Sequence, residues 1–269
     1  GYFGDDTAIE VQALTKLPDT INTLIRKENE KDSINFWFTP FEVDSLIFTV
    51  SNKKEKVIDT FTVKSRKVSL DTLVLAPNQR GSLSFNETFH ISATTPMVEI
   101  DSSKMKMISK DSLDVDLKIE LDTIANKVDF DFPLEPNENY SLELLPGAIT
   151  DFFGETNDSL SYNLSTQSFA DYGTLTVNIQ GAVEYPILVQ LTDTEGRMQL
   201  EIYAKEEQAF EFSNIEPSTY LIRVIQDSNG NGKWDTGNFL KNLQPEKVKY
   251  YPEEIEIRAN WEKIETFIL

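Results

Sequence analysis

Short runs in which apolar and polar residues alternate recur along the whole chain. The clearest early run is Ile34-Asn-Phe-Trp-Phe38, which is rich in aromatic side chains. Two more runs, Asp44–Val50 and Val57–Val63, are joined by the polar segment Asn52-Lys-Lys-Glu. Period-two alternation on both sides of a polar turn predicts an antiparallel hairpin. We expect helix only in short turns, for example at Pro18–Leu24.

Strand-like runs continue at short spacing beyond residue 76. In the middle of the chain we expect strands at Leu83–Phe85, Phe89–Ala93, Met105–Ile108, Leu113–Leu121, Lys127–Phe132, Tyr140–Leu145 and Ser161–Ser165. After the linker Gln167–Asp171 we expect them at Leu175–Ile179, Ile187–Leu191, Met198–Tyr203, Ala209–Phe212, Tyr220–Ile225 and within Val248–Trp261. Short strands separated by turns are typical of antiparallel β-sandwiches. The pattern therefore predicts an all-β protein of tandem antiparallel β-sandwich domains: a partial β-domain over 1–75, a second domain over 76–169 and a third over 170–269.

One loop carries a pattern of oxygen ligands. The segment Asp227-Ser-Asn-Gly-Asn-Gly-Lys-Trp-Asp235 has Gly232 at its sixth position, where a calcium loop turns sharply. The predicted ligands of a structural Ca²⁺ ion are Asp227, Asn229, Asn231, Asp235 and the backbone carbonyl of Lys233. Asn238 stands where a bidentate Glu is usual, so we expect weak affinity. The alternative is a hairpin loop that binds nothing, because Asn-Gly is itself a strong turn signal.

Composition narrows the possible functions. The formal charge is −20, and such a field repels nucleic acid and anionic lipid. The chain has no cysteine, so disulfides, thiolate nucleophiles and zinc–thiolate sites are excluded. No apolar run approaches the roughly 20 residues of a transmembrane helix. The start, Gly1-Tyr-Phe-Gly-Asp-Asp, lacks the features of a signal peptide, and we interpret it as interior sequence.

Candidate catalytic residues are few. The single histidine, His90, lies in a strand-like segment, and a general base or metal ligand usually needs partners. No Gly-x-Ser-x-Gly elbow, Walker loop or dinucleotide fingerprint is present. A glycosidase carboxylate pair stays open, because its spacing is invisible in sequence. We therefore expect no enzyme activity.

Four aromatic residues suggest an alternative function. Trp234, Tyr250, Tyr251 and Trp261 are able to form a platform on which sugar rings stack, as in a carbohydrate-binding or adhesive surface module. The competing interpretation is that they are core and loop-anchoring residues. A row of exposed aromatic rings on one sheet face would distinguish the two.

Two regions resemble known families. Phe89–Pro96, Tyr140–Gly154 and Asn157-Asp-Ser resemble the SbsA-type bacterial Ig-like module, in which a Tyr-x-Leu-x-Leu strand leads to a Gly-Ala-Ile-x-Asp-x-x-Gly turn. This resemblance covers residues 80–168. Ile215–Val224 resembles the turn and strand of transthyretin-like, carboxypeptidase-regulatory-like and other prealbumin-like domains, with Ser218 where those families usually have glycine.

The order of these regions resembles Ig-like-domain lipoproteins of Bacteroidetes, whose C-termini carry a similar Asn-Gly-Lys-Trp-Asp-Thr-Gly-Asn run. This resemblance implies a non-catalytic cell-envelope protein, associated with the outer membrane and either periplasmic or surface-exposed. Such a protein would act as a scaffold, spacer or subunit of a surface complex. Its partners would be other envelope or outer-membrane proteins.

A three-residue motif recurs eight times before the C-terminal domain. Asp is followed by Ser or Thr and then by Ala, Ile or Leu, which resembles the acceptor motif of the general O-glycosylation system of Bacteroidetes envelope proteins. Exposed turns tolerate bulky sugars. The predicted acceptor residues are Thr7, Thr20, Ser33, Ser45, Thr72, Ser112, Thr123 and Ser159. Turn and strand-entry preferences of Asp-Ser and Asp-Thr are able to produce the same series.

Overall fold

The computed structural model describes residues 9–28, 33–41, 43–53, 56–64, 72–181, 183–237 and 242–269. These residues form 23 β-strands and two short 3-10 helices, η2 (Ser102–Lys104) and η3 (Phe169–Asp171). The predicted all-β fold is therefore confirmed. No described helix is long and apolar enough to span a bilayer.

The segment Pro18–Leu24, where a short helical turn was expected, contains a single turn and no helix. Ile21 donates its backbone N–H to the carbonyl oxygen of Pro18 at 3.0 Å, which closes a single turn. Strand β2 (Thr23–Lys27) begins two residues later. The β-branched residues that follow Pro18 favour extended backbone over helix.

The described chain divides into two compact units. The first holds the described residues of 1–83 together with 88–133 and 138–165, and the second holds 84–87, 134–137 and the described residues of 166–269. The division into domains at 1–75, 76–169 and 170–269 stays a prediction.

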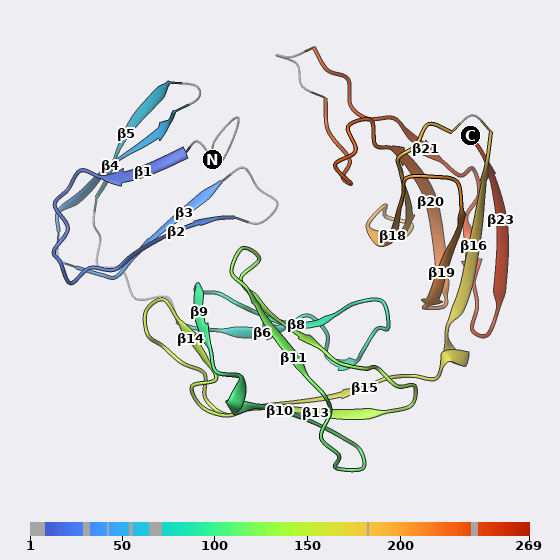
Figure 1. Ribbon diagram of the computed structural model, residues 1–269, viewed down its shortest axis with the longest axis horizontal. Coiled ribbons are helices and arrows are strands. Elements are labelled where there is room, and N and C mark those ends of the chain that lie inside the picture. Colours follow the sequence, from blue (N-terminus) through green and yellow to red (C-terminus); the bar gives the residue numbers. More distant parts are fainter. Residues whose placement is uncertain are drawn as a thin grey trace. The chain divides into compact units, whose positions relative to one another are not determined.

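The first part of unit 1 contains two small sheets (Figure 1). A three-stranded sheet has the order β1 (Ile9–Ala13), β4 (Ser45–Asn52), β5 (Val57–Lys64), and a two-stranded sheet joins β2 to β3 (Ile34–Phe38). The expected hairpin is present, because β4 and β5 pair antiparallel with Phe48 opposite Phe61. The strand expected at Ile34–Phe38 is also present.

The second part of unit 1 has two four-stranded sheets and a two-stranded one. The first sheet has the order β10 (Met105–Ser109), β13 (Asn139–Leu144), β15 (Leu160–Ser165), β7 (Gly81–Ser82). The second has the order β11 (Lys118–Asp122), β12 (Lys127–Asp131), β8 (Phe89–Ala93), β6 (Leu75–Pro77). The third pairs β14 (Ile149–Asp151) with β9 (Met97–Ile100). Fully buried side chains such as Ile91, Phe130 and Leu142 form the core.

Some strand boundaries in this part differ from expectation. The strand expected at Leu83–Phe85 lies at Gly81–Ser82, and Leu83 is a buried core residue just beyond it. The run expected from Leu113 becomes a regular strand only at Lys118. Before that point Asp114 makes one isolated bridge with Ile108. The side chains from 111 to 114 are exposed and gain nothing from sheet packing, so this segment forms no regular strand.

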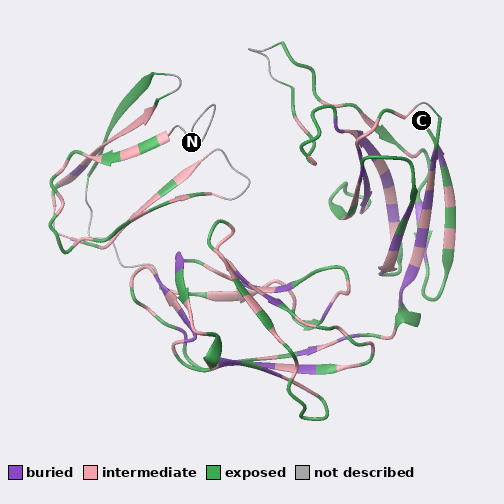
Figure 2. Ribbon diagram, viewed as in Figure 1, coloured by how far each residue is buried: buried purple, intermediate pink, exposed green. Residues whose placement is uncertain are grey.

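Unit 2 is built around two sheets. One has the order β19 (Ala209–Ile215), β16 (Gly173–Gln180), β23 (Glu262–Ile268). The other has the order β18 (Met198–Ala204), β17 (Ile187–Thr192), β20 (Ser218–Gln226), β21 (Val248–Tyr250), and β22 (Ile255–Ile257) also pairs with β20. Figure 2 shows the resulting alternation of buried and half-buried residues along β16. Leu175 and Val177 of β16 share one buried cluster with Val189 and Ile222.

Candidate metal centre

The predicted calcium loop begins where the central strand β20 ends. Asp227 follows Gln226 directly and is fully buried, and its backbone N–H donates to the carbonyl oxygen of Pro186 at 3.1 Å. The preceding strand places Val224 and Ile225 in the core. The first residue of the loop is therefore held by both its backbone and its burial.

The Asp227 carboxylate organises the loop backbone. Its Oδ1 accepts from the N–H groups of Gly230 at 2.8 Å and Asn231 at 3.2 Å, and its Oδ2 accepts from Gly232 at 2.8 Å. Both glycines have φ of +75°, a conformation that glycine adopts without steric cost. Burial by itself raises the pKa of Asp227, but the N–H groups of Gly232 and Gly230, followed by the Tyr203 hydroxyl and the N–H of Asn231, favour the charged carboxylate, and the pKa is lowered overall.

A tyrosine hydroxyl lies beside this carboxylate. The Tyr203 hydroxyl is buried and has no hydrogen-bond partner of standard geometry within the described part of the chain. Burial is the main cause that raises its pKa, and the nearby Asp227 carboxylate raises it further. The two groups are therefore close enough to interact, although they do not form a regular hydrogen bond.

The other predicted side chains converge on Asp235. The side-chain Nδ2 atoms of Asn229 and Asn231 both donate to Oδ2 of Asp235, at 2.5 and 2.7 Å. Their Oδ1 atoms accept backbone N–H groups two residues further on, those of Asn231 at 3.0 Å and Lys233 at 2.8 Å. The alternate positions of the sequence pattern thus form one hydrogen-bonded cluster.

Sequence reasoning missed one residue of this cluster, Glu246. Its Oε1 accepts from the N–H of Ser228 at 2.6 Å, and its Oε2 accepts from the N–H of Asp235 at 3.0 Å. Its carbonyl oxygen also accepts from the indole Nε1 of Trp234 at 3.3 Å. Glu246 follows the loop by more than ten residues, and no local pattern signals such a contact.

The donor set fits calcium in type. The predicted side-chain ligands offer carboxylate and amide oxygens, which a hard cation prefers, and the buried Asp227 retains lone pairs beyond its three bonds. In the hydrogen-bonded form, amide nitrogens rather than oxygens face Asp235. Within the described ranges no group of three or more His, Cys, Asp or Glu side chains has metal-binding geometry. Asn238 lies outside the described residues. Calcium binding therefore stays a prediction.

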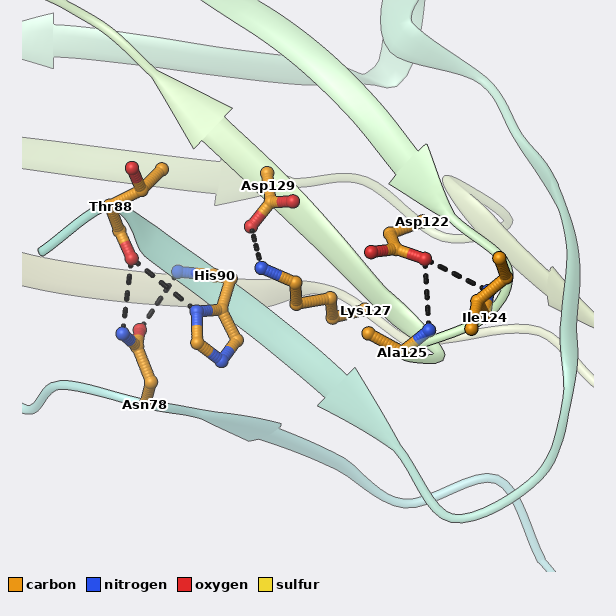
Figure 3. Close-up of polar contacts among 8 residues, drawn as sticks. All are labelled: Asn78, Thr88, His90, Asp122, Ile124, Ala125, Lys127 and Asp129. Atoms are coloured by element: carbon orange, nitrogen blue, oxygen red, sulfur yellow. Dashed lines mark hydrogen bonds and ion pairs between the residues drawn. The ribbon is translucent and has the colours of Figure 1, made fainter. Parts of the chain in front are cut away.

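His90 takes part in a different polar network, in unit 1 (Figure 3). Its backbone N–H donates to Oδ1 of Asn78 at 2.8 Å, and its ring Nδ1 lies 3.4 Å from the carbonyl oxygen of Thr88. Asp129, the residue opposite His90 on β12, is paired with Lys127 at 2.8 Å. Among the residues of Figure 3 no bond joins the imidazole to a carboxylate, and the drawn contacts hold strands and turns.

The four aromatic residues of the predicted platform lie in different segments of unit 2. Trp234 is in the loop, Tyr250 is in β21 and Trp261 precedes β23. All three are about half exposed or more. Tyr251 packs edge-on against Phe267 at 5.4 Å, so it is an anchoring residue. The three exposed rings do not share one strand.

The predicted glycosylation residues are mostly at the surface. Of the seven within the described ranges, five are exposed: Thr20, Thr72, Ser112, Thr123 and Ser159. Ser33 and Ser45 are half-buried, and the Ser33 hydroxyl donates to Oε2 of Glu28 at 2.6 Å. Thr7 lies outside the described residues.

A scan against protein-family models finds no match to the chain, and a search of curated protein sequences finds none. Among solved structures, the Bacillus anthracis TIE protein is similar at 12% sequence identity with a TM-score of 0.24. The match covers 76% of this chain and 41% of that one, so the chain spans less than half the length of that protein.

Two pilins are similar at a comparable level. The major pilin subunit of Bacillus cereus matches at 9% identity and a TM-score of 0.26, over 87% of this chain and 86% of the pilin. A backbone pilin of Streptococcus pyogenes with a modular three-domain structure matches at 6% identity and a TM-score of 0.24, over 84% of this chain and 64% of the pilin. TM-scores this low carry no argument about function.

Proposed function

We propose that the chain is a non-catalytic cell-envelope protein that acts as a scaffold, spacer or subunit of an outer-membrane or surface complex. A calcium ion staples its C-terminal unit. The proposal is supported by the way the chain uses its acidic side chains, and by the resemblance to Ig-like envelope lipoproteins.

One observation carries the proposal. At the ends of four strands, an aspartate caps the following turn by accepting two or three backbone N–H groups at 2.8–3.2 Å. The four residues are Asp122, Asp151, Asp193 and Asp227. Carboxylates used in this way hold loops rigid, because each satisfies backbone donors that would otherwise need water. Rigid turns between strands suit a spacer.

Calcium would extend the same principle to the longest of these turns. The side chains of Asp227, Asn229, Asn231 and Asp235 and the carbonyl of Lys233 would hold the ion. When bound, the ion supplies positive charge between two carboxylates and fixes the loop. The chain's own Glu246 already joins the loop to the segment before β21.

Isolation from the native envelope tests the assembly role. The envelope fraction of the host would be solubilised in mild detergent, cross-linked, and analysed by mass spectrometry. We expect the protein in the membrane fraction, cross-linked to the same envelope protein at fixed stoichiometry in repeated preparations. Recovery in the cytoplasmic fraction, or cross-links only to abundant proteins at varying stoichiometry, would contradict the proposal.

A further inference from the structure

An apolar cavity of about 1020 Å³ lies in the first part of unit 1. Strands β1, β3, β4 and β5 line it, and its wall includes Phe38 and the three rings of Phe36, Phe48 and Phe61. Phe48 stacks between the other two rings, with centroids 6.2 Å from Phe36 and 5.7 Å from Phe61. One charged side chain, Asp59, is part of the wall.

Within the part of the chain that the structure describes, the β5 side of this cavity is uncovered. Val63 and Leu46 are opposite each other on neighbouring strands and both line the cavity, yet Val63 is 50% exposed and Leu46 only 4%. Phe61 is 47% exposed, and Figure 2 shows β5 as exposed along its length. Large apolar side chains left open in a row mark a binding surface or an aggregation hazard.

The two sheets around the cavity differ by one strand. Sheet β1-β4-β5 has three strands, whereas β3 pairs only with β2 among the described residues. Ser33 and Thr39 bond to the β2 side, so the antiparallel alternation directs the backbone groups of Ile34, Phe36 and Phe38 to the other edge. The cavity wall includes Ile34, Asn35 and Phe36 in succession, so this part of β3 borders the cavity.

We propose that this edge binds an extended strand from a partner protein. The strand would pair with β3 as a third strand of its sheet, and its alternate apolar side chains would cover Phe61 and Val63. A lipid or other small apolar ligand would fill the volume but would leave the backbone groups of the β3 edge unpaired. A polypeptide strand satisfies both requirements.

The charge in the wall refines the partner's chemistry. Asp59, which is opposite Val50 on β4, lines the cavity. A partner strand that covers the cavity therefore removes water from the Asp59 carboxylate. Such desolvation costs free energy unless a cation pairs with the group. The partner strand therefore carries one Lys or Arg among its apolar residues. A second copy of this chain is disfavoured as the occupant, because each copy has a net charge of −20.

This inference rests on the proposed assembly role and names the kind of partner. The probe is a fluorescent synthetic peptide in which valine alternates with threonine and one central lysine replaces a valine. Fluorescence anisotropy would measure its binding to the full chain. We expect Phe61→Asp to weaken binding at least about tenfold, and Ile58→Asp, an exposed change on the other face of β5, to leave it unchanged.

A charge reversal completes the test. Asp59→Lys should weaken binding of the lysine peptide and favour a peptide with a central glutamate. Circular dichroism would confirm that each variant is folded. Equal binding to the Phe61 and Ile58 variants, binding of laurate without binding of peptide, or a wild-type dimer that Phe61→Asp dissociates would each overturn the proposal. Failure here would leave the native cross-linking experiment unaffected, so the two proposals can fail separately.

Discussion

Asp235 and Glu246 each donate a backbone hydrogen bond to the other. The N–H of Asp235 donates to Oε2 of Glu246 at 3.0 Å, and the N–H of Glu246 donates to the carbonyl oxygen of Asp235 at 3.1 Å. This reciprocal pair closes the Asp227–Asp235 loop against the segment that leads into β21. The loop is therefore held at its start by the buried Asp227 and at its end by Glu246.

Removal of the Glu246 carboxylate should loosen the loop. Glu246→Ala deletes two hydrogen bonds to a charged acceptor, and we expect the free energy of unfolding of unit 2 to fall by about 2 kcal/mol. Glu246→Gln keeps one oxygen acceptor and should lose less. Calorimetry would measure the effect, with the exposed Glu206→Ala as the control. Equal stability of Glu246→Ala and Glu206→Ala would show that the hydrogen bonds of the Glu246 carboxylate do not stabilise the loop.

Asn126 should be the most sensitive turn residue of unit 1. Its Oδ1 accepts from Met97 N–H and from Nη1 of Arg26, and its Nδ2 donates to the carbonyl oxygens of Ala93 and Thr95. Its φ is +54°. Asn126→Ala loses these bonds and strains the backbone, so we expect a loss of about 2–4 kcal/mol.

Two further variants separate the causes of that loss. Asn126→Gly removes the amide but accepts positive φ, so it should be about 1 kcal/mol more stable than the alanine variant. Thr123→Ala in the same turn changes an exposed residue and should be nearly neutral. Urea unfolding of the three proteins would decide. An alanine variant as stable as wild type would show that the amide bonds contribute nothing.

Tyr220 predicts an alkaline loss of stability. Its hydroxyl donates to the carbonyl oxygen of Glu216 at 2.8 Å, and burial, followed by the charge of Glu216, raises its pKa from 10.0 to about 12. A raised folded pKa of an acid contributes stability that is complete below pH 10 and is lost as the pH rises toward 12. Tyr220→Phe should therefore show a smaller decrease in stability over this range.

The exposed Tyr250 provides the control for this pH effect. Tyr250→Phe changes an exposed side chain outside the core, and we expect it to leave the pH dependence of stability as in wild type. Denaturant unfolding at several pH values would compare the three proteins. If Tyr220→Phe and Tyr250→Phe have the same pH dependence as wild type, ionisation of Tyr220 does not limit alkaline stability.

Glycosylation gives a prediction for protein isolated from its native host. Exposed acceptors should carry sugar mass more fully than the half-buried ones, because a glycan cannot be accommodated where the hydroxyl is packed. The Ser33 hydroxyl, which is bonded to Glu28, is the most restricted of these. Glycopeptide mass spectrometry would compare Thr123 and Ser159 with Ser33. An intact mass equal to the bare polypeptide would end this idea.

Local patterns predicted much of the fold. The β4–β5 hairpin was predictable because two alternating runs flank one polar turn, although only β4 buries or half-buries its side chains and β5 is exposed along its length. The hydrogen-bonded turn of Asp227–Asp235 was predictable because its polar side chains and glycines lie within nine residues, whereas calcium binding stays a prediction. In both cases the interacting residues are close in sequence.

Strand β23 was not predictable in the same way. It pairs parallel with β16, yet its half-buried face carries Lys263 and Glu265, while Ile264 and Ile268 are 70% and 73% exposed. Period-two alternation predicts that the isoleucines face the core and that Lys263 and Glu265 face solvent, which is the reverse of the structure. On this half-buried face the Glu265 carboxylate accepts a hydrogen bond from the Tyr251 hydroxyl at 2.8 Å. Contacts of this kind, like that of Glu246 with the loop, depend on residues distant in sequence.

The hydrogen bonds of Asp227 and Asp235 decide which variant tests calcium binding. Asp227 holds three backbone N–H groups without any ion, so Asp227→Ala should lower the melting temperature in calcium and in chelator alike. Asp235→Asn is the sharper variant, because asparagine retains an oxygen acceptor for Asn229 and Asn231 but removes one charge from the site.

The most direct measurement is the melting temperature of unit 2 in millimolar calcium and in chelator, for wild type and for Asp235→Asn. Calcium bound only to the folded state adds RT ln(1 + [Ca²⁺]/Kd), which is about 1.4 kcal/mol at a tenfold excess over Kd, so wild type should melt at a higher temperature in calcium. Asp235→Asn should lose most of that difference. Identical wild-type melting temperatures in calcium and in chelator would show that the loop is a hydrogen-bonded turn that binds no ion.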